Sequence, residues 1–519
     1  MSDSSLPLAA VPSAAAAYDG HGGTALLRSL SPLLAEWLPR QRWFAGKGRP
    51  LTGFSPVSAV ELLPCGAGGA TPGLLHLLVR ARQSAAPGTG DDCYQLLLGV
   101  REALPPELAP SLLGRPSTGP LRGRAVYEAL HDPRLTGLLL ERLRAPGRLG
   151  PLRFSRDPEA VIPSGLRPRP LTAEQSNSSV IYGSAYILKL FRRVGPGVNP
   201  DLELPLALAR QGRTAVPAPT AWFEAVTRGP SPDPVTLGVL QPFLPGAADG
   251  WQLALRALAA RRDFTGAASA LGRTTAEAHT GLARALPTSV LGGEQLEHLA
   301  AGMAARLDSA SAAVPALRPY RPALLDAFRE LAERGRDGGG CHAQRVHGDL
   351  HLGQALHTAD APAAEEPGGP RASEGSGAPE GSGDAALDAH HDGADGRWTL
   401  IDFEGEPARP LAERRADQPV VRDIAGMLRS FDYAACQCPA GPGDAWSQRW
   451  AAANRAAYCA GYADACGSDP RDDAVLLRAY ETDKAVYEVL YEARNRPSWL
   501  SIPLSAIRRL ADEKRSPSS

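Results

Sequence analysis

An aspartate flanked by two histidines, Asp349 in the stretch V-H-G-D-L-H-L-G-Q, is the residue of this chain best suited to chemistry. Such an aspartate can be a catalytic base, a metal ligand or an ordinary turn residue. Gln354 follows five residues later, and kinase catalytic loops use the same separation between the catalytic aspartate and a metal-binding amide. This spacing predicts that Asp349 is the base for an attacking hydroxyl and that Gln354 binds Mg²⁺.

A second carboxylate stands where phosphoryl transfer needs one. The apolar run from Trp398 to Ile401 predicts a strand, and Asp402 follows it in I-D-F-E-G, close to the kinase D-F-G motif with one residue inserted. We expect Asp402 to be the second Mg²⁺ ligand, although a turn residue at a strand end would look the same. Residues 354–357 and 397–401 are expected to pair as a hairpin with the low-complexity segment 358–396 at its tip.

A lysine inside a predicted strand supplies the cation that nucleotide phosphates need. Two β-rich runs, residues 179–183 and 186–191, are separated by a Gly-Ser turn and predict a hairpin with Lys189 in its second strand. Glu203 lies in the helical run that follows and is expected to pair with Lys189, the alternative being a solvated helix face. Pro205 in that run predicts that the helix starts late or bends.

The sequence before this lysine lacks the Gly-rich motif G-x-G-x-x-G. Short polar side chains stand in its place, and their hydroxyl, amide and backbone N–H groups are expected to cradle phosphate in a turn. Further on, an apolar segment is placed to form a hinge that offers groups to adenine. The expected nucleotide-binding residues, besides Lys189 and Glu203, are therefore Gln175, Ser176, Asn177, Ser178, Gln241 and Phe243.

A zinc site is the main alternative for His347, Asp349 and His351. Alternate residues on an extended loop would need further histidine or cysteine ligands, and only Cys341 and His342 lie nearby in the sequence. The order and spacing of the kinase-like residues make phosphoryl transfer the better explanation. We therefore expect His347 to brace the catalytic loop by hydrogen bonds and His351 to face the acceptor.

The run from Lys484 to Asn495 predicts a helix with two chemically different sides. One arc of roughly 100° carries polar and aromatic groups, and the opposite, apolar side is expected to pack on the lobe. Aromatic planes suit the C–H faces of a sugar and polar groups suit its hydroxyls, although tyrosines buried as core would give a similar pattern. The predicted acceptor-binding residues are Lys484, Tyr487, Glu488, Tyr491 and Asn495, with Arg494 reaching the same pocket.

The chain of 519 residues is long enough for two or three hydrophobic cores. We expect an α+β, bilobal, protein-kinase-like fold with an N-terminal cap subdomain, a β-rich nucleotide lobe and a mainly α-helical C-terminal lobe. The cap should begin with a helix over residues 25–38, followed by Trp43 and Phe44, which we expect to pack inside it. The predicted segments are a disordered tail (1–22), the cap (23–120), the nucleotide lobe (121–245) and the C-terminal lobe (246–519) with a disordered insertion (358–396).

Composition argues against several classes of partner. Lys plus Arg (55) and Asp plus Glu (56) nearly cancel, so neither nucleic acid nor an anionic membrane surface is expected. The seven cysteines are an odd number without C-x-x-C spacing, which argues against a disulfide framework and for a reduced, cytoplasmic location. The sequence has neither an apolar run of the roughly 20 residues that span a bilayer nor the features of a signal peptide.

These motifs resemble those of the actinobacterial maltokinases, members of the aminoglycoside phosphotransferase and eukaryotic-like kinase superfamily. V-H-G-D-L-H-L-G-Q, I-D-F-E-G-E-P and R-D-I-A-G-M-L-R-S-F-D-Y-A-A are similar to their catalytic segments. R-Q-R-W-F-A-G-K-G-R resembles their cap, I-L-K-L-F-R-R their nucleotide lobe, and K-A-V-Y-E-V-L-Y-E-A-R-N-R-P-S-W-L their sugar-binding helix. The long 358–396 segment and Asp417-Gln418-Pro419 depart from the family pattern, but neither contains an expected catalytic residue.

The resemblance implies ATP- and Mg²⁺-dependent phosphorylation of the anomeric hydroxyl of maltose to maltose 1-phosphate. It also implies a place in the route from trehalose to α-glucan, with trehalose synthase as a partner. From the residues alone, a kinase of glucosamine, an aminoglycoside or choline stays open, because a cationic acceptor would favour the carboxylates of Asp432, Glu488 and Glu492. A catalytically inactive scaffold is a further alternative, against which the complete catalytic set argues.

Overall fold

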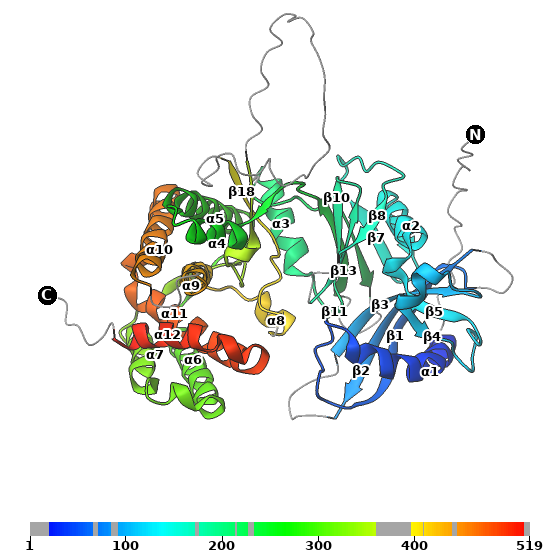
Figure 1. Cartoon of the computed structure of the whole chain (residues 1–519), viewed down its shortest axis with the longest axis horizontal. Helices are drawn as coiled ribbons and strands as arrows, with labels where there is room; N and C mark the ends of the chain where they lie inside the picture. Colours follow the sequence, from blue (N-terminus) through cyan, green and yellow to red (C-terminus); the bar gives the residue numbers. More distant parts are fainter. Residues whose placement is uncertain are drawn as a thin grey trace, which may run out of the picture. The chain divides into compact units, whose positions relative to one another are not determined.

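The computed structural model describes residues 20–65, 71–84, 92–171, 176–212, 215–226, 233–359, 396–407, 409–438 and 444–512. The chain divides into two compact units, whose elements are labelled in Figure 1. The first unit contains the cap and the nucleotide lobe, and the second contains the mainly helical lobe. The first comprises Met1–Leu206, Ala218–Pro245 and Pro407–Glu413, and the second comprises Ala207–Pro217, Gly246–Glu406 and Arg414–Ser519.

The cap is an antiparallel sheet with a long helix packed against it. Its strand order is β1-β2-β3-β5-β4, and the short strand β11 (Arg193–Val194) also pairs with β3. Leu26, Leu30 and Leu34 of the helix are buried at helical spacing against the strands. The cap elements are α1 (Gly20–Trp37), η1 (Leu38–Arg40), β1 (Leu51–Leu63), β2 (Gly73–Gln83), β3 (Asp92–Arg101), η2 (Pro106–Ser111), β4 (Leu112–Gly114) and β5 (Ala125–Glu128).

The structure tests three expectations for the cap. Trp43 and Phe44 are buried and their rings lie 5.9 and 5.3 Å from that of Tyr94, so the expected packing is confirmed. The first helix begins at Gly20, so the expectation of a tail through residue 22 was wrong at its end, and residues 1–19 lie outside the described residues. The cap sheet also runs past the boundary expected at residue 120, because β5 pairs with β3 inside it.

The nucleotide lobe is a second antiparallel sheet, in the order β6-β7-β12-β13-β10-β9-β8. The predicted hairpin is confirmed, since β9 pairs with β10 and places Lys189 opposite Ser179. Gly183 in its turn has a φ of 59°, a left-handed conformation that favours glycine. The elements are η3 (Ala129–His131), α2 (Pro133–Arg144), β6 (Gly147–Leu149), β7 (Leu152–Arg156), β8 (Pro168–Pro170), β9 (Ser178–Tyr182), β10 (Tyr186–Leu190), α3 (Pro200–Arg210), β12 (Ala221–Val226) and β13 (Pro234–Pro242).

Helix α3 begins at Pro200 and contains Pro205, so the expected late start is wrong. Pro200 at the first helical position is tolerated because the first N–H groups of a helix have no intrahelical acceptor, whereas Pro205 is the sixth residue and lies beyond the first turn. Asn199 precedes the helix, and its side-chain oxygen accepts a hydrogen bond of 2.9 Å from the Asp201 N–H. This capping bond places Asp201 in the first turn, close after the lysine strand.

Hydrogen bonds join the cap to the nucleotide lobe within the first unit. The Gln95 side-chain amide on β3 donates to the carbonyls of Phe191 and Leu237 at 2.9 and 2.8 Å. Its oxygen lies 2.9 Å from Nε2 of the buried His76. The cap therefore contacts the backbone directly after the lysine strand, and cap and nucleotide lobe share one core.

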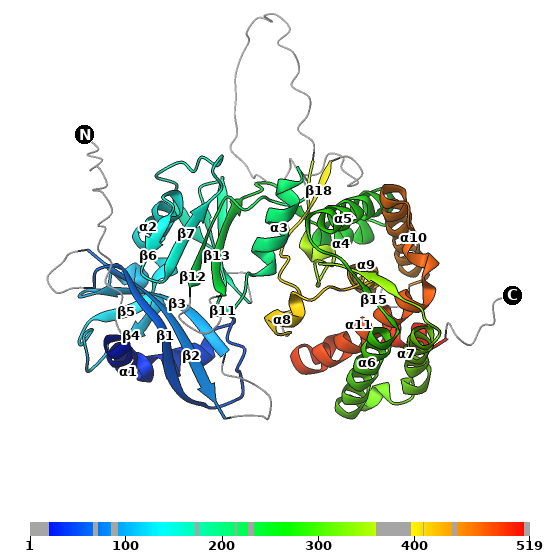
Figure 2. The ribbon, with the colours of Figure 1, turned by 180° about the vertical axis from the view of Figure 1, so that it is seen from behind.

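The second unit is mainly helical, as predicted, and Figure 2 shows it from behind. Helix α5 lies beside α10, and α9 packs against α11. On α11, Val486 and Val489 are buried, so the predicted apolar side is confirmed. The helices are α4 (Gly250–Ala259), α5 (Thr265–Ala285), α6 (Gly293–Ala313), η4 (Pro315–Leu317), α7 (Arg321–Arg336), η5 (Leu352–Gln354), α8 (Leu411–Arg414), α9 (Val421–Cys436), α10 (Ala445–Cys466), η6 (Pro470–Asp472), α11 (Ala474–Asn495), η7 (Pro497–Trp499) and α12 (Ser501–Asp512).

Short strands in the second unit carry the expected catalytic segments. The predicted hairpin is confirmed, because β17 and β18 pair antiparallel with Ala355 opposite Leu400 and Thr358 opposite Arg397. Most of the expected insertion, residues 360–395, lies outside the described residues. The strands are β14 (Ala248–Asp249), β15 (Ser289–Leu291), β16 (Cys341–Ala343), β17 (Ala355–Thr358) and β18 (Arg397–Leu400).

All seven cysteines are free thiols. Among the residues that the structure describes, none of the helices combines the length and the apolar character needed to cross a membrane.

Candidate active site

Asp349, the expected catalytic base, is ion-paired with Lys484 of helix α11. The Lys484 ammonium donates to Asp349 Oδ1 at 3.0 Å and to Glu406 Oε1 at 3.2 Å. Burial alone would lower the pKa of Lys484, but the two carboxylates outweigh it and hold the pKa well above its ordinary value. The catalytic loop and the expected acceptor helix are therefore joined by a charged lysine.

Glu406 extends this ion pair into a chain of alternating charges. Its Oε2 lies 3.2 Å from Nη2 of Arg422, and the Arg422 Nε donates to the Gly348 carbonyl at 3.3 Å. Gly348 has a φ of 85°, which glycine adopts readily, so the loop turns sharply just before Asp349. The positive charges of Lys484 and Arg422 thus balance the negative charges of Asp349 and Glu406. Lys484 contacts the Asp349 side chain, and Arg422 contacts the backbone just before it.

Asp423, in the first turn of α9, binds the backbone of the loop that carries Asp349. Its two carboxylate oxygens accept hydrogen bonds of 2.7 Å from the N–H groups of His347 and Gly348. His279 Nε2 lies 3.0 Å from the same carboxylate. Burial alone would raise the pKa of Asp423, but the hydrogen bond from His279 and the neighbouring charges and N–H groups lower it overall. A buried, ionised aspartate thus determines the path of the loop.

The two histidines of the motif make hydrogen bonds inside the loop. His347 Nε2 lies 2.9 Å from the Ile401 carbonyl, and its ring packs 4.6 Å from that of Phe403, which confirms the expected bracing. His351 Nδ1 accepts a hydrogen bond of 3.0 Å from the Gly353 N–H and so caps the short helix η5. Burial lowers the pKa of His351, which favours the neutral ring. Its expected contact with the acceptor stays a prediction.

Gln354 and Asp402, the expected metal ligands, contact each other. The Gln354 amide nitrogen donates to Asp402 Oδ2 at 3.0 Å, and the Ile401 N–H donates to the Gln354 carbonyl at 3.0 Å. Asp402 has a φ of 65°, an uncommon conformation for a residue with a side chain, and such conformations concentrate at functional sites. The pairing of β17 with β18 brings these two residues together across the hairpin.

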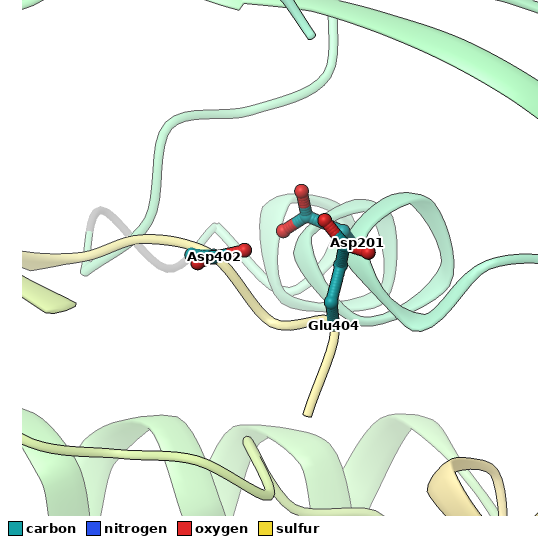
Figure 3. Close-up of side chains that lie close together, drawn as sticks. All are labelled: Asp201, Asp402 and Glu404. Atoms are coloured by element: carbon teal, nitrogen blue, oxygen red, sulfur yellow. The ribbon is translucent and has the colours of Figure 1, made fainter. Parts of the chain in front are cut away.

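Glu404 adds a carboxylate that the sequence analysis did not single out. One of its oxygens lies within 4.8 Å of an Asp402 oxygen, and both residues stand on the segment after β18 in Figure 3, which also labels Asp201 on α3. Carboxylate and amide oxygens are hard donors of the kind that Mg²⁺ prefers. The donor set of Gln354, Asp402 and Glu404 therefore fits a magnesium ion.

In the first unit, Lys189 of β10 forms an ion pair with Asp201. Its ammonium lies 2.8 Å from Asp201 Oδ2, and both side chains are largely buried. Lys189 also lies 5.7 Å from the ring centroid of Phe191. Sequence analysis expected Glu203 as the partner, and that pairing stays a prediction, whereas Asp201 was missed because its capped position depends on Asn199.

The remaining nucleotide-lobe residues lie at the edges of the hairpin. Ser178 is the first residue of β9, and its hydroxyl accepts a hydrogen bond of 2.8 Å from Arg192 Nε. Asn177 is buried and Ser176 is exposed, while Gln175 lies outside the described residues. Gln241 pairs with Ile187 near the end of β13, and the Phe243 N–H donates to the Ala185 carbonyl at 2.8 Å.

Helix α11 presents aromatic side chains next to the catalytic base. The Lys484 ammonium lies 5.1 Å from the Tyr487 ring centroid, and the rings of Tyr487 and Tyr491 stack with centroids 6.2 Å apart. Tyr491 is 38% exposed, so it is not a core residue. Asn495 donates to the Tyr491 carbonyl at 2.9 Å, and Arg494 is exposed.

The carboxylates on this side are paired with arginines. Two nitrogens of the buried Arg429 donate to Glu488 Oε2 at 3.0 and 2.7 Å, and Nη1 donates to Asp432 at 2.9 Å. Glu492 pairs with Arg496 at 2.6 Å. A cationic acceptor was considered because of the carboxylates of Asp432, Glu488 and Glu492. Each of these carboxylates is already in an ion pair with an arginine.

Several of these residues escaped sequence analysis. Asp201, Glu404, Glu406, Asp423 and Arg429 all stand next to motif residues or within quoted motifs. The spacing of these residues in the sequence indicated no role, because the position of each side chain depends on a partner from another segment of the chain. For Glu404, Glu406, Asp423 and Arg429, the available signal was only that they stand in I-D-F-E-G-E-P and R-D-I-A-G-M-L-R-S-F-D-Y-A-A; for Asp201 it was only proximity to Glu203.

Part of the chain matches a known domain family, and similar relatives include two glucosamine kinases. Residues 37–132 match the family described as the maltokinase N-terminal cap domain. A glucosamine kinase of Streptacidiphilus jiangxiensis is 28% identical over 368 residues, which is 67% of this chain and 74% of that protein. A glucosamine kinase of Mycolicibacterium smegmatis is also 28% identical over 368 residues, covering 66% and 80%.

Solved structures show the same fold. A glucosamine kinase in complex with glucosamine, ADP and inorganic phosphate superimposes with a TM-score of 0.60 at 23% identity, covering 92% of this chain and 98% of that one. A second crystal form of a glucosamine kinase gives 0.62 at 22% identity, covering 92% and 99%.

This protein has the α+β, kinase-like fold that its sequence predicted, so the expected fold class is confirmed. It carries a maltokinase N-terminal cap domain, as its resemblance to that group led us to expect.

Proposed function

We propose that this protein is an ATP-dependent sugar kinase that converts maltose to maltose 1-phosphate in the route from trehalose to α-glucan. The observation that carries phosphoryl transfer is the geometry around Asp349, with Gln354 and Asp402 in contact on the adjoining hairpin. The maltokinase cap domain supports maltose as the acceptor.

In the proposed reaction, Asp349 accepts the proton of the acceptor hydroxyl as its oxygen attacks the γ-phosphorus of ATP. A new P–O bond forms, the bond from the γ-phosphorus to the bridging oxygen of the β-phosphate breaks, and ADP leaves. Lys484 holds the Asp349 carboxylate in place through its 3.0 Å contact. The ion pair with Glu406 keeps the lysine charged while it does so.

Mg²⁺ supplies neutralisation of the β- and γ-phosphate charge when it is bound. Gln354 and Asp402 are the residues assigned to hold it, and the nearby Glu404 carboxylate fits the same donor set. Lys189, held by Asp201, is assigned to the nucleotide phosphates, together with the polar residues Gln175 to Ser178. Gln241 and Phe243 are assigned to adenine.

The acceptor is assigned to the polar side of α11. The stacked Tyr487 and Tyr491 provide aromatic planes for the C–H faces of a hexose, and Lys484 provides a donor for its hydroxyls. Their contact with the catalytic base through Lys484 supports an acceptor position beside Asp349. Contacts from His351, Glu488, Arg494 and Asn495 are part of the same proposal.

Glucosamine is the second candidate acceptor. Both similar relatives are named glucosamine kinases, and one solved structure of that name holds glucosamine with ADP and phosphate. At 28% identity this likeness supports a sugar kinase more strongly than it supports a particular sugar.

Steady-state phosphate transfer from ATP with Mg²⁺ tests the proposal directly. Maltose, glucose, glucosamine, trehalose and an aminoglycoside serve as acceptors, and ³¹P NMR identifies each product. Maltose 1-phosphate as the main product is the expected result, and glucosamine phosphate in its place would overturn the acceptor assignment. Transfer to none of them would favour the inactive scaffold. Analytical ultracentrifugation with trehalose synthase tests that partnership separately.

A further inference from the structure

A network of charged side chains lies next to the polar side of α11, to which the acceptor is assigned, and includes Glu488 of that helix. The network contains three arginines and three carboxylates. One of the carboxylates, Asp432, lies 2.9, 3.2 and 2.8 Å from the guanidinium nitrogens of Arg429, Arg455 and Arg509. Arg429 is 1% exposed, so the network lies inside the second unit. The other two carboxylates are Glu488, bonded to Arg429, and Glu481, bonded to Arg455.

Glu488 is the member of this network that reaches the acceptor side. It lies one helical turn after Lys484, and its charge acts on that of Lys484. Its side chain is only 12% exposed, and Arg429 donates two hydrogen bonds to one of its oxygens. The negative charge of Glu488 is therefore compensated from inside the protein.

An acceptor carrying an ammonium group needs an uncompensated carboxylate to offset the water that it loses on binding. Beside Asp349, the charges of Lys484 and Arg422 balance those of Asp349 and Glu406. On the polar side of α11 that the structure describes, Glu488 is the carboxylate that could pair with such an ammonium group, and Arg429 occupies it.

We propose that Arg429 is a specificity-determining residue, which neutralises Glu488 and so makes the acceptor side select an uncharged sugar over an amino sugar. The inference rests on the proposed function, because it assumes that α11 binds the acceptor. Arg429, although buried and not in contact with the substrate, would thus determine whether an uncharged sugar or an amino sugar is preferred. An arginine suits this role because its charge persists at every working pH and its planar fork holds the carboxylate by two bonds.

The test compares glucose and glucosamine, which differ only in the group at C2, by isothermal titration calorimetry in the presence of ADP and Mg²⁺. Binding is measured instead of turnover, so failure of the inference is distinguishable from loss of phosphotransfer. Wild-type protein is expected to bind glucosamine no more tightly than glucose. Arg429→Met should raise the preference for glucosamine about tenfold or more, because Glu488 becomes an uncompensated partner for the ammonium.

Two further variants keep the test decisive. The double variant Arg429→Met with Glu488→Gln should return the ratio to the wild-type value, and Arg449→Met, at an exposed position on α10, is the matched control. Glu488→Gln alone leaves Arg429 paired with Asp432 but not with residue 488, so the ratio should shift further towards glucose. The Glu488→Gln variant keeps the inference testable if Arg429→Met does not fold. A shift towards glucosamine in Glu488→Gln, an unchanged ratio in folded Arg429→Met, or binding of neither sugar would overturn the inference.

Discussion

At the scale of single residues, the proposed reaction depends most on Asp349. Asp349→Asn keeps the size of the side chain but removes the carboxylate that accepts the proton, so kcat should fall by a factor on the order of 10² or more. The KM for ATP should stay close to wild type, because the nucleotide contacts are assigned to other residues. Initial rates over a range of ATP concentrations measure both constants.

The control for this variant is Asp464→Asn, at an exposed position on α10. Turnover near the wild-type rate in Asp349→Asn would refute the assignment of the base.

Lys484 acts on the reaction through Asp349. Lys484→Met would leave the carboxylates of Asp349 and Glu406 without the ammonium that now lies 3.0 and 3.2 Å from them. Because hydrogen bonds to charged groups are worth about 1.5–3 kcal/mol, kcat/KM for the sugar should fall roughly 10- to 100-fold. Lys484→Arg should recover part of the loss by restoring the charge. Equal rates in all three proteins would show that the ion pair has no part in catalysis.

At the scale of elements, helix α9 holds the catalytic loop through one carboxylate. Asp423→Asn replaces an oxygen that accepts backbone N–H groups with an amide nitrogen, which should lower the free energy of unfolding by about 3 kcal/mol. The kcat should fall as well, because the loop carries Asp349. Urea unfolding at a series of pH values measures the stability difference.

The pH dependence of this effect has a definite sign. The pKa of Asp423 is lower in the folded protein than its ordinary value, so the ionised carboxylate stabilises the fold above that value. This contribution is lost as the pH falls through the folded pKa. The difference between wild type and Asp423→Asn should therefore be largest near neutral pH and shrink below a pH of about 4. A difference that grows in acid would contradict the assigned ionisation.

At the scale of the whole molecule, the cap is part of the core of the first unit. Gln95→Leu would remove the side-chain donor to the buried carbonyls of Phe191 and Leu237, of which Leu237 keeps the Phe191 N–H, and would leave Nε2 of His76 without its partner. Unsatisfied buried groups cost about 1–3 kcal/mol each, so Tm should fall by several degrees. The KM for ATP should rise more than that for the sugar, because Phe191 lies two residues after Lys189.

Calorimetry and initial rates test this variant against Gln448→Leu, at an exposed position on α10. An unchanged Tm would mean that the cap contributes little to the stability of the nucleotide lobe.

Much of the fold follows from local patterns. The hairpins around Lys189 and between Gln354 and Asp402 were predicted because strand runs and turns are encoded by neighbouring residues. The two-sided helix α11 was predicted because its spacing repeats along one segment. The start of α3 was missed, because the expectation was based on Pro205, the sixth residue of the helix, whereas the start is set by the capping residue Asn199 and by Pro200 at the first position.

The sequence by itself determined the order of the motifs and the elements that carry them, since both are set by residues close together in the chain. Only the tertiary structure decided which charges meet. Lys484 reaches Asp349 across 135 residues, and Arg429 reaches Glu488 across 59. Such pairs leave no periodic signal, because the first forms only when α11 meets the loop that carries Asp349, and the second only when α9 and α11 pack together.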